Sequence, residues 1–288
     1  MNYAALIQNR KSVRAFREKQ VPFQTLEQLK AYYRDGVQRL IPEIGTELYF
    51  FGTDAREALE GAAGYHKFLV GAPQYLVLLT ESHPQAGLNA GFVMEDLILK
   101  LTDLQLDSCW VTFTDSEQVK ESLGIESDLQ VAAIAAFGYG EKTTRRLRLN
   151  IKSMSNIDII AKRQYFEPKV SVRELVHREQ WGSRDGLGDA IGFYDDMLWE
   201  SLFAASLAPS YLNRQAYGFL LHDGCISLVE RPDRYNTRID SDLSLGAVML
   251  HFAAVAEGWT GPFRWNLEAD PHGLQIPEGY RLVASASL

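Results

Sequence analysis

Two short stretches of this sequence carry side chains suited to holding a compact anion. The first is Arg10-Lys11-Ser12-Val13-Arg14, in which three cations and a hydroxyl group lie within one short segment. The second is a basic cluster made of Lys142, Arg145, Arg146 and Arg148. Arginine binds phosphate oxygens through parallel hydrogen bonds and stays charged at neutral pH. We interpret the clusters as candidates for binding one phosphate group, and solvated surface charge is the alternative.

A third stretch, Pro209-Ser210-Tyr211-Leu212-Asn213-Arg214-Gln215, places hydrogen-bonding groups directly after a predicted helix. That helix is expected at about 193–207, because Pro209 disfavours helical geometry in the residue before it. The last carbonyl groups of a helix lack partners within it, and Ser and Asn favour turns. The stretch predicts either a tight turn that presents polar groups to a ligand or a simple helix stop.

The composition of the chain excludes several classes of protein. The 288 residues carry a net charge of −8, whereas binding to nucleic acid depends on neutralising many phosphates. No apolar run approaches the roughly 18 residues of a membrane span, and residues 1–16 lack the apolar segment of a secretory signal. Cys109 and Cys225 provide no disulfide framework. We expect a cytoplasmic protein that binds neither nucleic acid nor a membrane.

Common catalytic and metal-binding motifs are absent from the sequence. Gly138-Tyr139-Gly140 follows a predicted strand, but the third glycine of the dinucleotide fingerprint is replaced and the next residues are basic. No P-loop, G-x-S-x-G elbow or H-E-x-x-H zinc motif occurs. His222 and Cys225 lack a second pair of ligands. We interpret His251 as a satisfied core histidine, and Cys109 as a buried thiol at the end of a core helix. The sequence predicts no metal site.

An internal repeat organises the chain. Gly91–Trp110 and Gly246–Trp265 both begin with glycine, carry methionine three positions later and end with tryptophan, at an offset of 155 residues. Apolar residues in the first copy recur at spacings of three and four, which predicts a helix at 91–107, with Asp96 and Lys100 on its polar side. The second copy is apolar almost all round, which predicts a helix buried on most sides. We therefore expect the two helices to pack together, and two unrelated core helices are the alternative.

The remaining elements mix helices and strands without strict alternation, which favours an α+β fold. The segment 141–190 is charged and without clear period, so we interpret it as an excursion that crosses from one half to the other. Strands are predicted at 47–51, 75–80, 129–137, 217–221, 225–229 and 280–284, and further helices at 2–16, 26–33 and 116–123.

These stretches together resemble the nitroreductase family of FMN-dependent oxidoreductases. The family's R-[RK]-S-x-[RK] motif is similar to residues 10–14, and its A-P-S-x-x-N-x-Q motif is similar to Ala208–Gln215. Its G-L-x-x-C-W-like sequence after the core helix is similar to Leu106–Trp110. Members of that family are typically homodimers with two FMN sites at the interface. Each site is built from the basic motif of one subunit and the P-S-x-x-N motif of the other.

In this chain the two motifs lie in different halves. The first-half counterpart of the turn, Pro42-Glu43-Ile44-Gly45-Thr46, lacks serine and asparagine at the matching positions, and Ser171-Val172-Arg173 is only a faint echo of Ser12-Val13-Arg14. We therefore predict a nitroreductase-like pseudo-dimer of two fused, intertwined units, 1–160 and a truncated 161–288. One composite FMN site is kept and the other is degenerate, so the chain is expected to be a monomer.

The resemblance implies the following roles. Arg10, with Arg145 or Arg146, would hold the phosphate or ribityl end of FMN, and Arg14 would lie near the pyrimidine edge of the ring. The other residues assigned to the site are Lys11, Ser12, Pro209, Ser210, Tyr211, Asn213 and Gln215. FMN would accept hydride from NAD(P)H and pass electrons to a nitroaromatic or a quinone. A non-catalytic flavin binder or a degenerate scaffold is the alternative.

Overall fold

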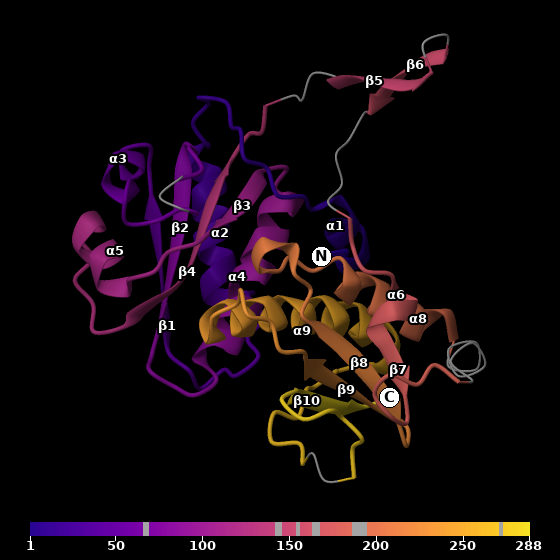
Figure 1. The fold of residues 1–288 in the computed structure, drawn as a ribbon. Coiled ribbons are helices and arrows are strands. Elements are labelled where there is room, and N and C mark those ends of the chain that lie inside the picture. The colour runs from indigo at the N-terminus through magenta and orange to yellow at the C-terminus, as the bar shows by residue number, and fades with distance from the viewer. Residues whose placement is uncertain (66–68, 142–145, 154–155, 163–167, 186–194, 271–272) are drawn as a thin grey trace.

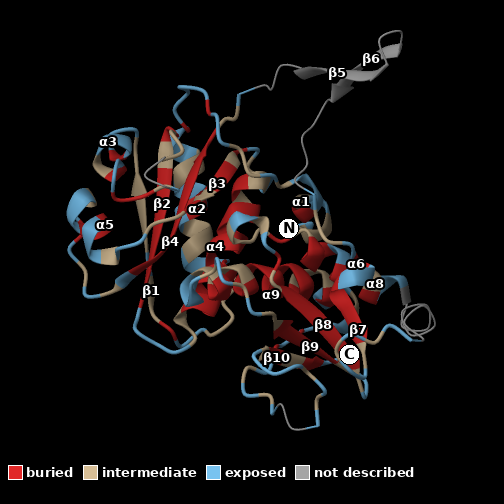
Figure 2. Ribbon diagram, in the orientation of Figure 1, coloured by how far each residue is buried: buried red, intermediate tan, exposed pale blue. Residues whose placement is uncertain are grey.

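The computed structural model describes residues 1–65, 69–141, 146–153, 156–162, 168–185, 195–270 and 273–288. Figure 1 shows the first half of the chain, indigo to magenta, on one side of the molecule and the second half, orange to yellow, on the other. Between them lie two long helices, α4 (Ala86–Asp103) and α9 (Arg238–Thr260). Figure 2 shows that buried residues concentrate in these helices and in the strands beside them.

The first half is a four-stranded antiparallel sheet covered on both faces. Its order is β1 (Thr46–Phe51), β2 (Gln74–Thr80), β4 (Gln130–Gly138) and β3 (Asp107–Val111). Alternate residues of a strand face opposite sides of the sheet. In β2, Leu76 and Leu78 pack with α4, whereas the residues between and beside them pack with the short helices on the other face. The remaining helices of this half are α1 (Tyr3–Asn9), α2 (Phe23–Asp35), α3 (Ala55–Leu59) and α5 (Ser116–Leu123).

The second half repeats the antiparallel strands of the first. β8 (Tyr217–His222), β9 (Cys225–Glu230) and β10 (Arg281–Ser287) follow one another in the sheet as β1, β2 and β4 do, with α9 in the place of α4. A short parallel strand, β7 (Val176–Arg178), joins the outer edge of β8. The helices of this half are α6 (Val172–Leu175), α8 (Asp195–Ser206), the 3-10 turn η1 (Tyr211–Asn213) and α9.

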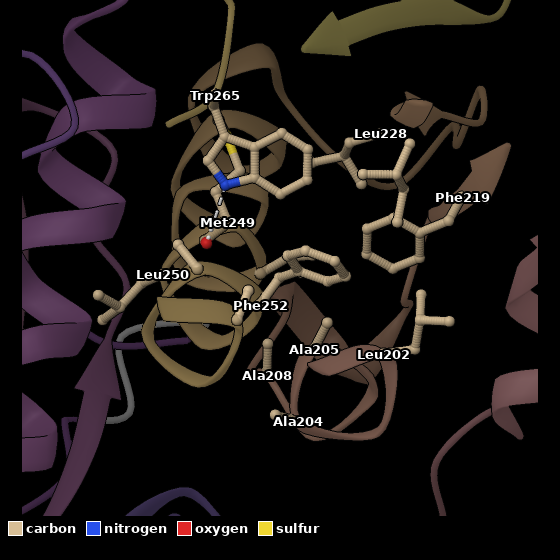
Figure 3. Close-up of a cluster of buried hydrophobic side chains, with 14 of the residues drawn as sticks. Leu202, Ala204, Ala205, Ala208, Phe219, Leu228, Met249, Leu250, Phe252 and Trp265 are labelled. Atoms are coloured by element: carbon tan, nitrogen blue, oxygen red, sulfur yellow. Dashed lines mark hydrogen bonds between the residues drawn. The ribbon is translucent and has the colours of Figure 1, made fainter. Parts of the chain in front are cut away.

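Aromatic packing holds α9 on the second sheet. Figure 3 shows Phe252 of α9 between Phe219 of β8 and Trp265, with their ring centroids 5.8 and 5.4 Å from its own. The Trp265 indole N–H donates to the carbonyl of Met249 at 3.1 Å. The helix is long and apolar enough to cross a membrane, yet 72% of its apolar window is buried inside the protein. Its apolar surface is therefore used for packing, as predicted.

The two long helices approach each other most closely at the repeated glycines. A Cβ atom on Gly91 would lie 2.2 Å from the carbonyl oxygen of Leu243, and one on Gly246 would lie 2.1 Å from that of Leu88. The offset of 155 residues that relates Gly91 to Gly246 also relates Leu88 to Leu243. The contact of Gly91 with Leu243 is thus repeated by that of Gly246 with Leu88, with the two helices exchanged. Such a repeated contact is the pattern of a two-fold interface.

Two side chains that hold turns on the long helices are also related by this offset. Asn89 of α4 accepts a hydrogen bond from the backbone N–H of Ile41 at 2.9 Å, and Ser244 of α9 accepts one from Tyr211 at 3.1 Å. Both donors lie in the turn that joins a helix to the first antiparallel strand of its half. The predicted α+β fold built from two related halves is therefore confirmed.

Several predicted boundaries are wrong. Helix α4 begins at Ala86 and ends at Asp103, because Gln105 adopts a left-handed conformation with φ of 59° that stops the helix. Cys109 is buried, as expected, but on β3 rather than at the end of a helix. The N-terminal helix ends at Asn9, and residues 12–16 continue as extended chain. Asp96, expected on the polar face of the helix, is fully buried.

The segment expected to be an irregular crossing contains a hairpin, β5 (Arg146–Ser153) with β6 (Asn156–Lys162). Figure 1 shows this hairpin apart from the two sheets. The chain then returns to β7 and joins the second sheet, so it crosses between the halves as expected. The boundary between units 1–160 and 161–288 stays a prediction.

The close approach of the helices makes a sharp prediction. We expect Gly246→Ala to lower the free energy of unfolding by about 3 kcal/mol or more, because its Cβ would overlap backbone atoms that cannot move independently. Gly258→Ala on the same helix is the matched control, since nothing lies within 4 Å of its added methyl group. The control should be neutral or stabilise by up to about 1 kcal/mol. Urea denaturation measures both, and equal effects would contradict the crossing geometry.

Candidate functional site

The basic motif lies at the edge of the first sheet. Arg10 ends α1, and Ser12 forms a parallel bridge with Ser108 of β3. The backbone N–H of Val13 donates to the carbonyl of Ser108 at 2.9 Å. Lys11 and Arg14 are exposed. The motif is therefore fixed to the sheet by its backbone while two of its cations face outward.

Arg10 itself points inward. Its side chain is only 8% exposed, and its Nε lies 3.3 Å from Oε1 of Glu95, which is fully buried on α4. The other carboxylate oxygen of Glu95 accepts a hydrogen bond from the indole N–H of Trp110 at 2.9 Å. Burial alone would raise the pKa of Glu95, but Arg10, His251 and Trp110 together hold it below its usual value. The carboxylate therefore stays charged inside the protein.

His251 completes this buried cluster and brings the second half into it. Its Nε2 lies 3.0 Å from Oε1 of Glu95, and its Nδ1 lies 3.0 Å from the carbonyl oxygen of Ala204 on α8. A carbonyl can only accept, so Nδ1 carries a proton. His251 is thus a satisfied core histidine, as predicted. Through Glu95 it also links Arg10, the first residue of the basic motif, to α8, the helix that precedes the second-half turn.

The turn after α8 has an unusual backbone. Leu212, Asn213 and Gln215 have φ values of 48°, 56° and 46°, a left-handed region in which the Cβ of an L residue is crowded. Three such residues in four positions are costly, and strain of this kind persists only where surrounding contacts over-determine the conformation. Strained segments of this type cluster at binding sites, so the turn is a candidate functional element.

Side chains predicted to contact a ligand instead hold this turn. Ser210 Oγ accepts a hydrogen bond from the backbone N–H of Gln215 at 3.0 Å. Asn213 uses both ends of its amide, accepting from Lys169 and donating to the carbonyl of Pro168. Gln215 is buried and bonds to Val170 and Ser206. Direct ligand contacts by Asn213 and Gln215 stay a prediction, but their side chains are already committed within the protein.

The turn displays Tyr211 and Leu212 instead. Leu212 is 48% exposed, and Tyr65 of the first half is 47% exposed. Burial raises the pKa of Tyr211, and the charges of Asp240 and Tyr65 raise it further. The loop that carries Tyr65 is tied to the end of β3, where the N–H of Gly64 donates to the carbonyl of Thr112 at 2.6 Å. Tyr65 of the first half and Tyr211 of the second are therefore candidates for contact with an aromatic ligand.

The basic motif and the turn lie along the same helix. Arg10 reaches α9 through Glu95 and His251, and Tyr211 is bonded to Ser244. Seven residues separate His251 from Ser244, which corresponds to about 10 Å along the helix axis. One motif from each half is therefore connected to α9, and their union in one composite site stays a prediction.

The second basic cluster is less defined. Arg145 lies outside the described residues, and Arg146 begins β5, whose side chains are likewise outside them. Its predicted partnership with Arg10 stays a prediction. Pro209 is half-buried between α8 and the turn. Among the described residues, no group of three or more histidine, cysteine, aspartate or glutamate side chains could hold a metal ion.

The segments that the sequence predicts to be degenerate counterparts of the two motifs make other contacts. Ser171, the echo of Ser12, caps α6 together with Glu174. Arg173 is exposed, and its carbonyl accepts a hydrogen bond from Arg184. The first-half turn begins at Ile41, within one residue of the expected position. The segment predicted to have lost ligand binding therefore serves to cap a helix.

Sequence reasoning missed the residues that support the site. Glu95 gave one usable signal, since it is a carboxylate inside a run of apolar residues on a predicted core helix. Tyr65 and Lys169 gave none, because each acts on a residue far away in the chain.

Comparisons with known proteins agree with this geometry. The sequence matches the family described as "Putative TM nitroreductase" over residues 2–172. A crystal structure described as a putative nitroreductase from Thermotoga maritima is 16% identical with a TM-score of 0.59, and the alignment covers 100% of this chain and 94% of that one. A nitroreductase with bound FMN from Bacteroides fragilis is 21% identical over 54% of this chain and 97% of that one, with a TM-score of 0.42. Comparison with curated proteins finds no match.

The α+β fold is thus nitroreductase-like, and the Thermotoga structure shares that fold over the whole chain. Because the matched region spans more than half of the sequence, the chain belongs to the TM nitroreductase family.

The buried cluster predicts strong coupling between two residues. Arg10→Met should lower the free energy of unfolding by about 3–5 kcal/mol, because it leaves Glu95 charged and buried without its cation. The double variant Arg10→Met/Glu95→Gln should recover much of that loss, since no buried charge then remains unpaired. Denaturant titration of a double-mutant cycle measures the coupling. Arg34→Met, which removes an exposed ion pair, is the control, and additive effects in the cycle would disprove the pairing.

Asp96 predicts a pH dependence of the opposite sign to most carboxylates. Burial raises its pKa from 3.8 to about 6, although Gln38, Tyr32 and Tyr3 donate hydrogen bonds to it. Between these pH values the folded state binds the proton and the unfolded state releases it, so stability falls as pH rises. Relative to Asp96→Asn, the wild type should lose up to about 3 kcal/mol across this window. Denaturation of both proteins at several pH values tests this, and parallel curves would contradict it.

Proposed function

We propose that this protein is an FMN-dependent oxidoreductase of the nitroreductase type, with one composite flavin site per chain. The observation that supports the proposal is that the basic motif of the first half and the strained turn of the second half are both connected to α9. NAD(P)H would be the electron donor, and a nitroaromatic or a quinone the acceptor. The two free cysteines suit a reducing compartment such as the cytoplasm.

The residues present fit a flavin mononucleotide. Lys11 and Arg14 are exposed cations that suit a phosphate group. Arg10 Nε is buried and lies 3.3 Å from Glu95 Oε1 without forming a hydrogen bond, so it remains a donor that the oxygen of a nearby ligand could complete beside its ion pair. The exposed ring of Tyr65 and the half-buried ring of Tyr211 suit a planar aromatic system.

In this proposal the protein binds and orients, and the cofactor supplies the hydride chemistry at its N5 atom when bound. Lys11 would hold the phosphate end, and Arg14 would lie near the pyrimidine edge of the ring. The turn would keep Tyr211 and Leu212 in place, and Tyr65 would close the other side of the ring. The positive charge of the motif would favour the anionic reduced form of the cofactor.

The alternative is a flavin binder without turnover, or a scaffold. One observation favours it, because Arg10 and Asn213 are both committed to partners within the protein. Reduction separates the two functions. An enzyme loaded with FMN should lose its yellow colour with NAD(P)H under anaerobic conditions and regain it on addition of a quinone, whereas a non-catalytic binder should stay yellow.

Flavin content tests the composite site itself. The purified protein should release one FMN per chain on denaturation, since only one site has the full set of residues. Lys11→Gln with Arg14→Gln should weaken FMN binding by roughly 10- to 100-fold through the loss of charged hydrogen bonds. The matched control is Lys30→Gln with Arg34→Gln, which removes the same charge from the exposed face of α2. Two FMN per chain, or equal loss in both variants, would rule out the composite site. We further expect a monomer, since the related halves already occupy each other's interface.

A further inference from the structure

The strained turn is held mainly by a segment that belongs to the other, degenerate motif. Pro168 accepts a hydrogen bond from the Asn213 amide at 2.8 Å. Lys169 Nζ donates to the Asn213 amide oxygen at 2.9 Å and to the carbonyl of Ala208 at 2.8 Å. The backbone N–H of Val170 donates to the side chain of Gln215 at 3.0 Å. Three successive residues thus contact both committed side chains of the turn.

The position of these residues in the repeat is informative. When Ser171-Val172-Arg173 is aligned with Ser12-Val13-Arg14, Lys169 falls at the position of Arg10. Arg10 extends into the core of the protein and pairs with Glu95. Lys169 instead reaches the turn of its own half. Equivalent cations in the two halves therefore act on different partners.

The contacts of Lys169 suit the support of a turn. The carbonyl of Ala208 lies just beyond the end of α8, where carbonyl groups lack helical partners and carry partial negative charge. The ammonium group joins this carbonyl to Asn213, one of the three residues with left-handed backbone. Lys169 therefore links Ala208, before the turn, to Asn213, within its left-handed part.

We propose that Lys169 is a positioning residue for the composite site. The segment 169–173, the second-half counterpart of the basic motif, has changed from ligand binding to support of the turn. Lys169 keeps Asn213 left-handed and thereby holds Tyr211 and Leu212 on the surface. Its effect on flavin binding rests on the function proposed above, whereas its effect on the turn does not.

The experiment compares Lys169→Met with Lys169→Arg, which can still donate, and with Lys30→Met, which removes a lysine from an exposed ion pair. Hydrogen exchange is followed by mass spectrometry in peptides that cover residues 209–217, and FMN binding is followed by quenching of flavin fluorescence. Lys169→Met should speed exchange in the turn by about tenfold and weaken FMN binding by about tenfold. Lys169→Arg should restore both within about threefold, and Lys30→Met should change neither.

A second variant guards against general destabilisation. Asn213→Gly removes the amide that Lys169 holds and suits the left-handed backbone. In that background Lys169→Met should have a smaller further effect on exchange, because the contact with Asn213 is already gone and only the one with Ala208 remains. An unchanged turn in Lys169→Met, or an undiminished effect in the Asn213→Gly background, overturns the proposal. If the wild type binds no FMN while exchange still depends on Lys169, the proposed function fails and the positioning role stands.

Discussion

The structure depends on one close contact, the crossing of α4 and α9 at Gly91 and Gly246. Backbone atoms of each helix occupy the space that a side chain would fill on the other. Only glycine permits this approach, so the two helices must cross at one place and in one orientation. The two sheets pack on the outer sides of the pair, and each turn that precedes an antiparallel strand is bonded to the helix of its own half. The crossing therefore decides which parts of the two halves can meet.

The buried cluster shows how this arrangement connects the site. Glu95 contacts Arg10 and Trp110 from the first half and His251 from the second. A buried carboxylate is stable only with full compensation, because leaving it unpaired costs several kcal/mol (about 3–5). The cation at the start of the ligand motif is thus also the counter-ion of the core. Binding chemistry and packing share Arg10, and a change at one is expected to act on the other.

The sequence was informative where a local pattern decides the structure. The repeated glycine, methionine and tryptophan predicted the paired helices, and Pro209 with Ser210 predicted the turn. Periodicity failed at the end of α4, because the apolar run continues from helix into β3 and only the left-handed Gln105 separates them. It also placed Asp96 on the polar face, since its partners Tyr3 and Tyr32 come from other helices. Neither the inward turn of Arg10 nor the role of Lys169 follows from spacing, because both depend on residues brought together by the fold.

Fusion of the halves permits chemistry that a symmetric dimer could not hold. At the offset of 155 residues, Glu95 corresponds to Leu250 and Asp96 corresponds to His251. In a dimer of identical subunits, every contact across the two-fold interface occurs twice. A buried Glu that faces a His of the other subunit would therefore be accompanied by a second, identical Glu–His pair. Here the pair of Glu95 and His251 needs no second copy. Asp96, at the position in the first half that is equivalent to His251, accepts hydrogen bonds from tyrosines instead. The same freedom allows Arg10 and Lys169 to differ. Asymmetry at the crossing is therefore the physical condition that the proposed single composite site requires.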